Sequence, residues 1–184
     1  MHKVLIIFFI LNLYSPVFSS VKEKIVAQMK LTNNLSFNFI QTIDNKNENG
    51  KCIIKYPKKI WCKYDNSIKK IIVSNGKSLV IKTANKGSYY FYPLSKTPLN
   101  ILLDKNYLIS KIKTLEAREI DNKYLNFKFF ENNNEINVFF DIKGLNLIGW
   151  QTEDIYQNLV ITFISSVKIN QKINNKIFFL PKNN

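Results

Sequence analysis

The chain has 184 residues, of which 46% are apolar and 14% aromatic, and its 27 Lys and Arg against 13 Asp and Glu give a formal net charge of +14. This apolar content is enough to bury one core, and a single domain is expected at this length. With only 5 Gly, 5 Pro and 2 Cys, collagen, a disulfide-framework miniprotein and a Cys-rich zinc module are excluded.

Residues 1–19 have the pattern of a secretory signal peptide. Lys3 precedes a mainly apolar run over 4–13 that is too short to span a bilayer core of about 30 Å, and Pro16 and Ser19 follow it. We expect cleavage after Ser19 or Ser20 and export of a single domain over 20–184. An uncleaved membrane anchor is the alternative.

The excess of lysine indicates a solvated basic surface. The basic residues are scattered singly along most of the chain. A weak attraction to anionic lipid headgroups is a second interpretation of the charge. Nucleic-acid binding is not expected, because the domain is predicted to leave the cytoplasm.

The first elements are a helix and a strand. Val21, Ile25 and Met29 recur every four residues, which predicts an amphipathic helix over 21–31. Apolar and polar residues then alternate, which predicts a half-buried strand over 35–43. Residues 44–50 are expected to form a polar loop.

The rest of the chain is predicted to be mostly strands. Pro57 and Asn75-Gly76 mark two hairpin turns, and Thr97-Pro98 opens a short helix. The expected strands are 51–55, 60–64, 69–74, 77–83, 88–92, 112–119, 124–130, 135–142, 145–152, 158–167 and 176–180, with a helix over 97–104. About ten or eleven of these segments, paired antiparallel, form a sheet long enough to curl, and two short amphipathic helices are available to fill its concave face.

The chain lacks the usual motifs of catalysis. Its only histidine is His2, within the predicted signal peptide, so Ser–His, Cys–His and His–zinc sites are not expected. It has no nucleophile elbow, Walker loop or dinucleotide fingerprint. We therefore expect neither an enzyme nor a cofactor or metal, and an exported hydrolase is a disfavoured alternative.

Cys52 and Cys62 are equally far from the predicted turn at Pro57. If they lie directly opposite each other, they can form a disulfide. A shift of one residue in register would separate them, and free cysteines pack well in a core. Either arrangement gives them a structural role.

Several short motifs along the mature chain resemble the LolA family of periplasmic lipoprotein carriers, in the family's order. They are Phe39-Ile40-Gln41, Gly50, Lys55-Tyr56-Pro57, Val73-Ser74-Asn75-Gly76-Lys77-Ser78-Leu79, Thr97-Pro98-Leu99, Gly149-Trp150 and Phe178-Phe179 with Pro181. Each motif is weak alone, and their order makes the resemblance more specific.

The resemblance implies an incomplete, open antiparallel β-barrel of about eleven strands, mainly β with short helices that cover it as a lid. It implies a periplasmic monomer that binds the acyl chains of lipoproteins released by an inner-membrane ABC transporter. Delivery would be to the outer-membrane receptor LolB. An exported half-barrel that binds lipid or senses lipoproteins without shuttling them is the alternative.

Side-chain alternation, together with the resemblance, gives the expected site. The acyl-chain cavity wall would comprise Phe37, Phe39, Ile54, Tyr56, Ile60, Tyr64, Leu79 and Ile81. The lid would contribute Val21, Ile25, Met29, Leu99, Leu102 and Leu103. Ordinary core packing is the alternative for each of these residues. The best-known carriers have an arginine at the position of Tyr56 that hydrogen-bonds the lid, so a weaker lid attachment is expected here.

Overall fold

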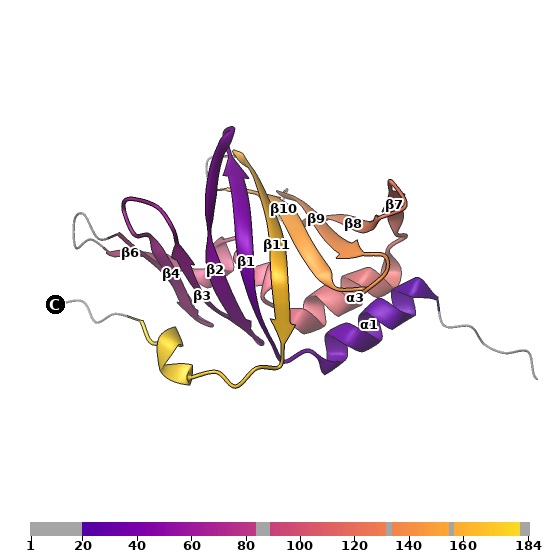
Figure 1. Ribbon diagram of the computed structural model, residues 1–184, viewed down its shortest axis with the longest axis horizontal. Helices are drawn as coiled ribbons and strands as arrows, with labels where there is room; N and C mark the ends of the chain where they lie inside the picture. Colours follow the sequence, from indigo (N-terminus) through magenta and orange to yellow (C-terminus); the bar gives the residue numbers. More distant parts are fainter. Residues whose placement is uncertain (1–19, 84–88, 132–133, 155–156, 181–184) are drawn as a thin grey trace, which may run out of the picture.

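One open antiparallel sheet forms most of the molecule (Figure 1). The computed structural model describes residues 20–83, 89–131, 134–154 and 157–180. Within these residues the sheet has eleven strands in the order β6-β5-β4-β3-β2-β1-β11-β10-β9-β8-β7. The expected fold class is therefore confirmed, while the predicted signal peptide over 1–19 lies outside the described residues.

The elements follow the chain in a simple order. The strands are β1 (Asn34–Ile43), β2 (Lys46–Lys55), β3 (Lys59–Tyr64), β4 (Ile71–Asn75), β5 (Ser78–Lys82), β6 (Tyr89–Pro93), β7 (Arg118–Ile120), β8 (Tyr124–Glu131), β9 (Asn134–Asp141), β10 (Leu147–Glu153) and β11 (Leu159–Ile169). The helices are α1 (Val21–Leu31), α2 (Leu99–Leu102) and α3 (Lys105–Thr114), with 3-10 helices η1 (Leu94–Lys96) and η2 (Asn175–Phe178).

Residues 44–50 do not form the expected loop. β1 and β2 are joined by a two-residue turn at Asp44 and Asn45, which both have positive φ, at 47° and 61°. The following residues are polar but pair with β1 along its whole length. Gly50 of β2 is required there, since a Cβ atom would lie 2.2 Å from the carbonyl oxygen of Lys63.

The predicted strand over 112–119 is wrong in its first half, where α3 ends. Asp104 caps α3 by accepting a hydrogen bond of 3.1 Å from the backbone N–H of Tyr107. Leu108, Ile109 and Ile112 form its buried face. Only Arg118–Ile120 is extended, as the short edge strand β7.

The predicted strand over 176–180 is also wrong. This segment overlaps η2, which packs against β3 and β4. Phe178 is 2% exposed and lies outside the main hydrophobic cluster. Val73 and Val80, paired across β4 and β5 on the opposite face from that cluster, are also buried. Phe178, Val73 and Val80 are called the convex patch below.

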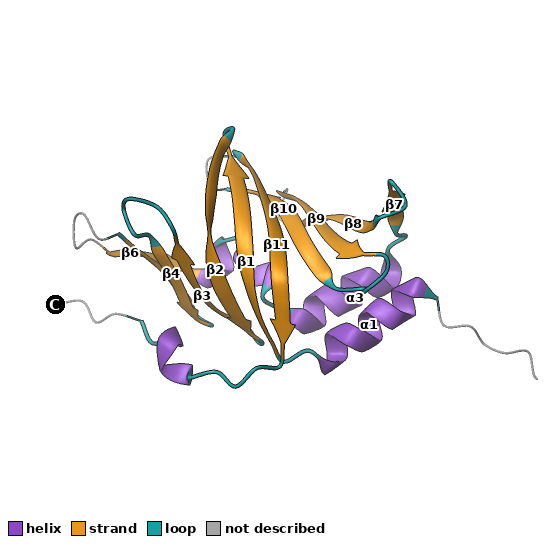
Figure 2. Ribbon diagram, in the orientation of Figure 1, coloured by secondary structure: helices purple, strands orange, loops and turns teal. Residues whose placement is uncertain are grey.

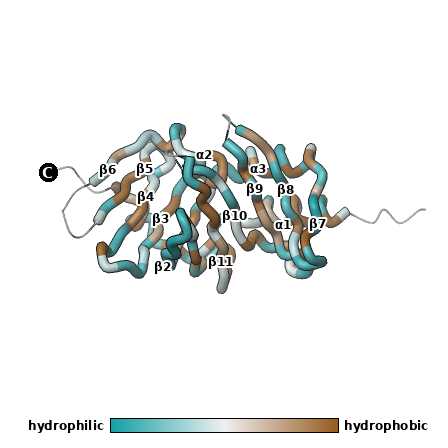
Figure 3. Tube along the Cα trace, turned by 90° about the horizontal axis from the view of Figure 1, so that it is seen from above, coloured by the Kyte–Doolittle hydropathy of each residue, from teal (hydrophilic) through white to brown (hydrophobic). Residues whose placement is uncertain are grey.

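The main hydrophobic cluster lies between the sheet and helices α1, α2 and α3. In Figure 2, α1 and α3 run side by side along one part of the sheet, and contacts between them agree with this view. Brown and teal segments alternate along the strands in Figure 3, as expected when only one face of each strand packs against the helices. The three helices are called the lid.

Candidate functional site

One wall of the concave face is formed by β1, β2, β3 and β5. Six residues of the expected cavity wall are buried in the main cluster there: Phe37, Phe39, Ile54, Ile60, Tyr64 and Leu79. Tyr56 is half-buried and packs against the cluster. Ile81 is half-buried and is not a member of the cluster.

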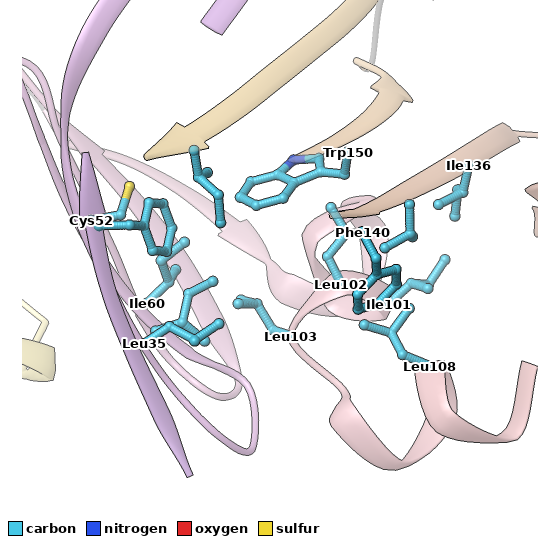
Figure 4. Packing of buried hydrophobic residues seen from close by; sticks show 14 of the residues in the cluster. Leu35, Cys52, Ile60, Ile101, Leu102, Leu103, Leu108, Ile136, Phe140 and Trp150 are labelled. Carbon is cyan, nitrogen blue, oxygen red and sulfur yellow. The ribbon is translucent and has the colours of Figure 1, made fainter. Parts of the chain in front are cut away.

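A second wall comes from the opposite half of the sheet, and sequence reasoning did not assign it. It comprises Leu125, Phe127, Phe129, Ile136, Val138, Phe140, Trp150 and Ile164. The two walls meet where the Phe37 ring packs edge-on against Trp150, with ring centroids 6.2 Å apart. In Figure 4, Leu35 and Ile60 on one side face Trp150 and Phe140 on the other, with Leu102 and Leu103 between them.

The lid contacts differ in part from those expected. Ile25, Leu102 and Leu103 are buried, and Met29 and Leu99 are half-buried against the cluster. Val21, however, is 43% exposed, and the next turn of α1 buries Val26 as well as Ile25. The buried lid residues that sequence reasoning missed are Val26, Ile101, Leu108, Ile109 and Ile112. The signal that could have identified α3 was Asp104, a capping residue that precedes the helical spacing of Leu108 and Ile112.

In the described part of the chain, two small cavities lie between the lid and the walls of the concave face. One, of about 30 Å³, opens near Met29, Tyr56 and Ile169. The other, of about 10 Å³, is lined only by apolar residues, among them Ile60, Leu103 and Trp150. Leu108 and Leu147 border both. Such volumes hold about one or two water molecules, so the lid side chains themselves fill most of the concave face.

The turn between β2 and β3 holds the lid near α2. The backbone N–H of Lys58 donates to the carbonyl oxygen of Leu103 at 2.9 Å, and its ammonium lies 3.4 Å from the Asp104 carboxylate. The hydroxyl of Ser74 in turn donates to the carbonyl oxygen of Lys58 at 3.1 Å. This contact therefore joins the turn to the junction of α2 and α3.

Lys105 makes a second attachment, between α3 and the end of α1. Its ammonium donates to the carbonyl oxygens of Lys30 at 3.1 Å and Thr32 at 2.7 Å. These carbonyls belong to the C-terminal end of α1, where a cation is favoured. The same ammonium lies 5.7 Å from the ring centre of Tyr56, and burial raises the pKa of the Tyr56 hydroxyl. A cation from the lid thus lies near Tyr56, the position at which the resemblance described above implied an arginine in other carriers.

The far end of the concave face carries a short chain of polar groups. The Tyr64 hydroxyl donates to Gln41 Oε1, and Gln41 Nε2 donates to the Thr162 hydroxyl, both at 3.0 Å. Phe39 packs edge-on against Tyr64 with ring centroids 4.8 Å apart. Burial, followed by the nearby Glu48 carboxylate, raises the pKa of Tyr64. Tyr64 therefore stays neutral at physiological pH, and these groups satisfy one another at the edge of an apolar layer.

Cys52 and Cys62 lie directly opposite each other in the β2–β3 pair and are joined as a disulfide, with their Cα atoms 4.1 Å apart. Their side chains are buried in the wall.

Over the residues that the structure describes, no group of acidic, Cys or His side chains could hold a metal ion. In the same residues, every helix is too short or too polar to cross a membrane.

The chain is similar in fold to several solved structures. A LolA superfamily protein from Nitrosomonas europaea is 10% identical, with 88% of this chain and 99% of that chain covered and a TM-score of 0.45. LprF from Mycobacterium bovis is 12% identical (84% and 94% covered, TM-score 0.46). A putative outer membrane lipoprotein-sorting protein domain from Vibrio parahaemolyticus is 7% identical (84% and 94% covered, TM-score 0.46).

A family model gives the clearer result. No curated protein is significantly similar in sequence. The model of the outer membrane lipoprotein carrier protein LolA, in contrast, matches residues 30–180, from the end of α1 to just beyond η2. This range contains both walls of the concave face, α2, α3 and most of the motifs quoted above. The chain therefore belongs to the LolA family.

Proposed function

We propose that this protein is a periplasmic carrier that holds the acyl chains of lipoproteins between the two walls and the lid. The observation that carries the proposal is one apolar layer running across both halves of the sheet beneath three helices. Membership of the LolA family supports the same function. The protein would act as a monomer, without catalysis or a cofactor.

The energetics of acyl chains favour a covered site. Each buried CH₂ group contributes about 0.8 kcal/mol, so several long chains gain tens of kcal/mol when they leave water. Binding must remain reversible if the cargo is to be delivered. A lid that fills the empty site meets this need, because displacing Leu102, Leu103 and Leu108 offsets part of the gain.

Polar attachments of the lid would add to the cost of opening. Gln28 of α1 donates to Asn146 Oδ1 at 2.6 Å, and Lys111 of α3 lies 3.5 Å from Glu131 of β8. The Lys58 contact holds α2, and the Lys105 contact holds α3 against α1. A net contribution of about 1 kcal/mol is typical of one hydrogen bond. Opening therefore costs little compared with the burial of a long acyl chain, and tyrosine at position 56 is compatible with a closed lid.

The proposal also includes export by a cleaved signal peptide and two partners, one that loads the carrier and one that receives the cargo. Cleavage between Ser19 and Ser20 would retain the capping box in which Ser20 and Glu23 satisfy each other's backbone N–H groups. Loading would come from an inner-membrane lipoprotein-releasing ABC transporter, and delivery would be to LolB or an equivalent receptor.

A transfer experiment tests shuttling. Residues 20–184 are added to spheroplasts that retain a labelled triacylated lipoprotein, and the supernatant is then mixed with outer-membrane vesicles. A carrier releases the lipoprotein as a soluble complex and passes it to the vesicles. A lipid binder or sensor that does not shuttle binds acyl chains but releases no lipoprotein, and that result would overturn the proposal.

A further inference from the structure

The charges of the sheet are distributed unequally between its two ends. One end, called the basic edge, comprises residues 29–35, 55–59, 103–105 and 167–176. Asn34 pairs with Lys55, and Leu35 pairs with Ile169. The Lys105 and Lys58 contacts described above add the lid segments. Figure 1 shows the end of α1, the start of β1 and the end of β11 meeting at this edge, at the bottom of the view.

Lysines occur in all four segments of the basic edge, and its only acid is Asp104, which is paired with Lys58. The side chains of Lys30, Lys168, Lys172 and Lys176 are exposed. No other acid in this part of the chain compensates their charge. The edge therefore presents a positive potential to solvent.

The opposite end of the same strands is mixed in charge. Its segments 42–50, 63–70, 152–154 and 157–160 carry five acids, Asp44, Glu48, Asp65, Glu153 and Asp154, and four lysines, Lys46, Lys63, Lys69 and Lys70. Lys70 and Glu48 form an ion pair there. The basic edge thus carries eight lysines and one acid, a net charge of +7, whereas the opposite end carries a net charge of −1.

Exposed apolar side chains and the cavity mouth lie on the same edge. Leu31 is 73% exposed and Ile169 is 40% exposed. Asn170 joins their two segments by donating to the carbonyl oxygen of Leu31 at 2.9 Å. Ile169 also lines the cavity that opens beside Met29 and Tyr56. Apolar residues surrounded by lysines are typical of a surface that contacts anionic lipid headgroups.

We propose that the basic edge docks on an anionic phospholipid bilayer and that this docking presents the mouth of the cavity to the membrane surface. Charge complementarity selects an anionic bilayer as the partner, while Leu31 and Ile169 add apolar contact at the headgroup level. The mixed opposite end would face away from the membrane. This inference concerns the surface of the protein and does not depend on which ligand the concave face holds.

Vesicle flotation with the protein from residue 20 onward tests the proposal. Phosphatidylglycerol-containing vesicles should bind the protein at low salt, binding should weaken at high salt, and pure phosphatidylcholine vesicles should not bind it. Each lysine near an anionic surface changes partitioning on the order of fivefold. Lys168→Glu with Lys172→Glu should therefore lower partitioning at least tenfold.

Matched variants separate docking from net charge. Lys46→Glu with Lys63→Glu changes the net charge equally at the opposite end, where both lysines are exposed. When the two variants are compared at physiological ionic strength, this one should keep partitioning within about threefold, because charges beyond a Debye length of about 8 Å are screened. Leu31→Ser should weaken binding, whereas Phe130→Ser, on an equally apolar and 61% exposed residue of β8, should not.

Absence of binding to the anionic vesicles, or equal losses in the two charge variants, would overturn the proposal. Failure of acyl-chain binding is a separate result, since flotation requires no lipoprotein. A basic-edge variant that still binds a soluble acylated ligand but no longer floats would support docking as an independent property.

Discussion

The two faces of the sheet are covered in different ways. On the concave face three helices cover a cluster drawn from both halves of the sheet, and small cavities remain along the boundary. On the convex face η2 packs against β3 and β4, and the convex-patch residues Val80 and Phe178 are 1% and 2% exposed. The comparison suggests different roles: the convex patch stabilises the fold, whereas the proposed function requires the cover of the concave cluster to move.

Substitution in the convex patch should have the largest effect on stability. Phe178→Ala removes a buried ring and should lower the free energy of unfolding by about 3 kcal/mol, measured by urea denaturation. Acyl-chain binding by the folded variant should be unchanged. Ile177→Ala, on a half-buried neighbour, should cost clearly less. Loss of ligand binding in folded Phe178→Ala protein would show that the two faces are not independent.

A matched pair of threonine substitutions compares the faces directly. Ile60→Thr and Val80→Thr each place a hydroxyl among buried side chains and should lower stability by about 1–3 kcal/mol. Only Ile60→Thr should weaken binding of a triacylated lipopeptide, by about tenfold, because Ile60 lies in the apolar layer. Titration with a fluorescent lipopeptide measures the affinity of each variant. Equal effects on binding would contradict the assignment of the concave face.

Removal of one lid attachment should strengthen binding. Lys105→Met removes the hydrogen bonds to the C-terminal end of α1 and should lower the cost of opening by about 1 kcal/mol, or about fivefold in Kd. Lys113→Met, on an exposed residue of the same helix, is the control. A weaker rather than tighter complex in Lys105→Met would mean that Lys105 contacts the ligand instead of holding the closed lid.

The smallest expected effect is a change in how stability depends on pH in the alkaline range. Burial raises the pKa of Tyr56 above its unfolded value, so its contribution to stability is present below about pH 10 and is lost as the pH rises further. Tyr56→Phe should therefore lose less stability than the unaltered protein between about pH 10 and 11. Tyr124→Phe, at an exposed residue, controls for removal of a hydroxyl. Parallel pH profiles for all three proteins would contradict a buried Tyr56.

Most strands could be predicted from the sequence because alternation and turn residues report local geometry. Phe37 and Phe39 alternate with polar residues, and Gly76 in the β4–β5 turn has a φ of +101°. The β1–β2 hairpin was missed because residues 46–50 have low strand propensity and are held extended by pairing with β1. α3 was missed because Ile109 and Ile112 are β-branched residues, which are also common in strands.

The candidate site was predictable on one side only. Alternation places Ile54, Ile60 and Leu79 on one face of their strands, and the structure brings them into one cluster. Which residues of β8–β10 face them depends on how the sheet curls, and a single sequence does not specify that curvature. The exposure of Val21 likewise depends on where α1 crosses α3.

Hydrogen exchange of the protein with and without a bound triacylated lipopeptide tests the central claim most directly. If the acyl chains displace the lid, amides in α2 and α3, residues 99–114, should exchange faster in the 1:1 complex, while β1–β3 stay protected. Unchanged or slower exchange throughout the lid in a saturated complex would contradict the account, because the ligand would then occupy another part of the molecule.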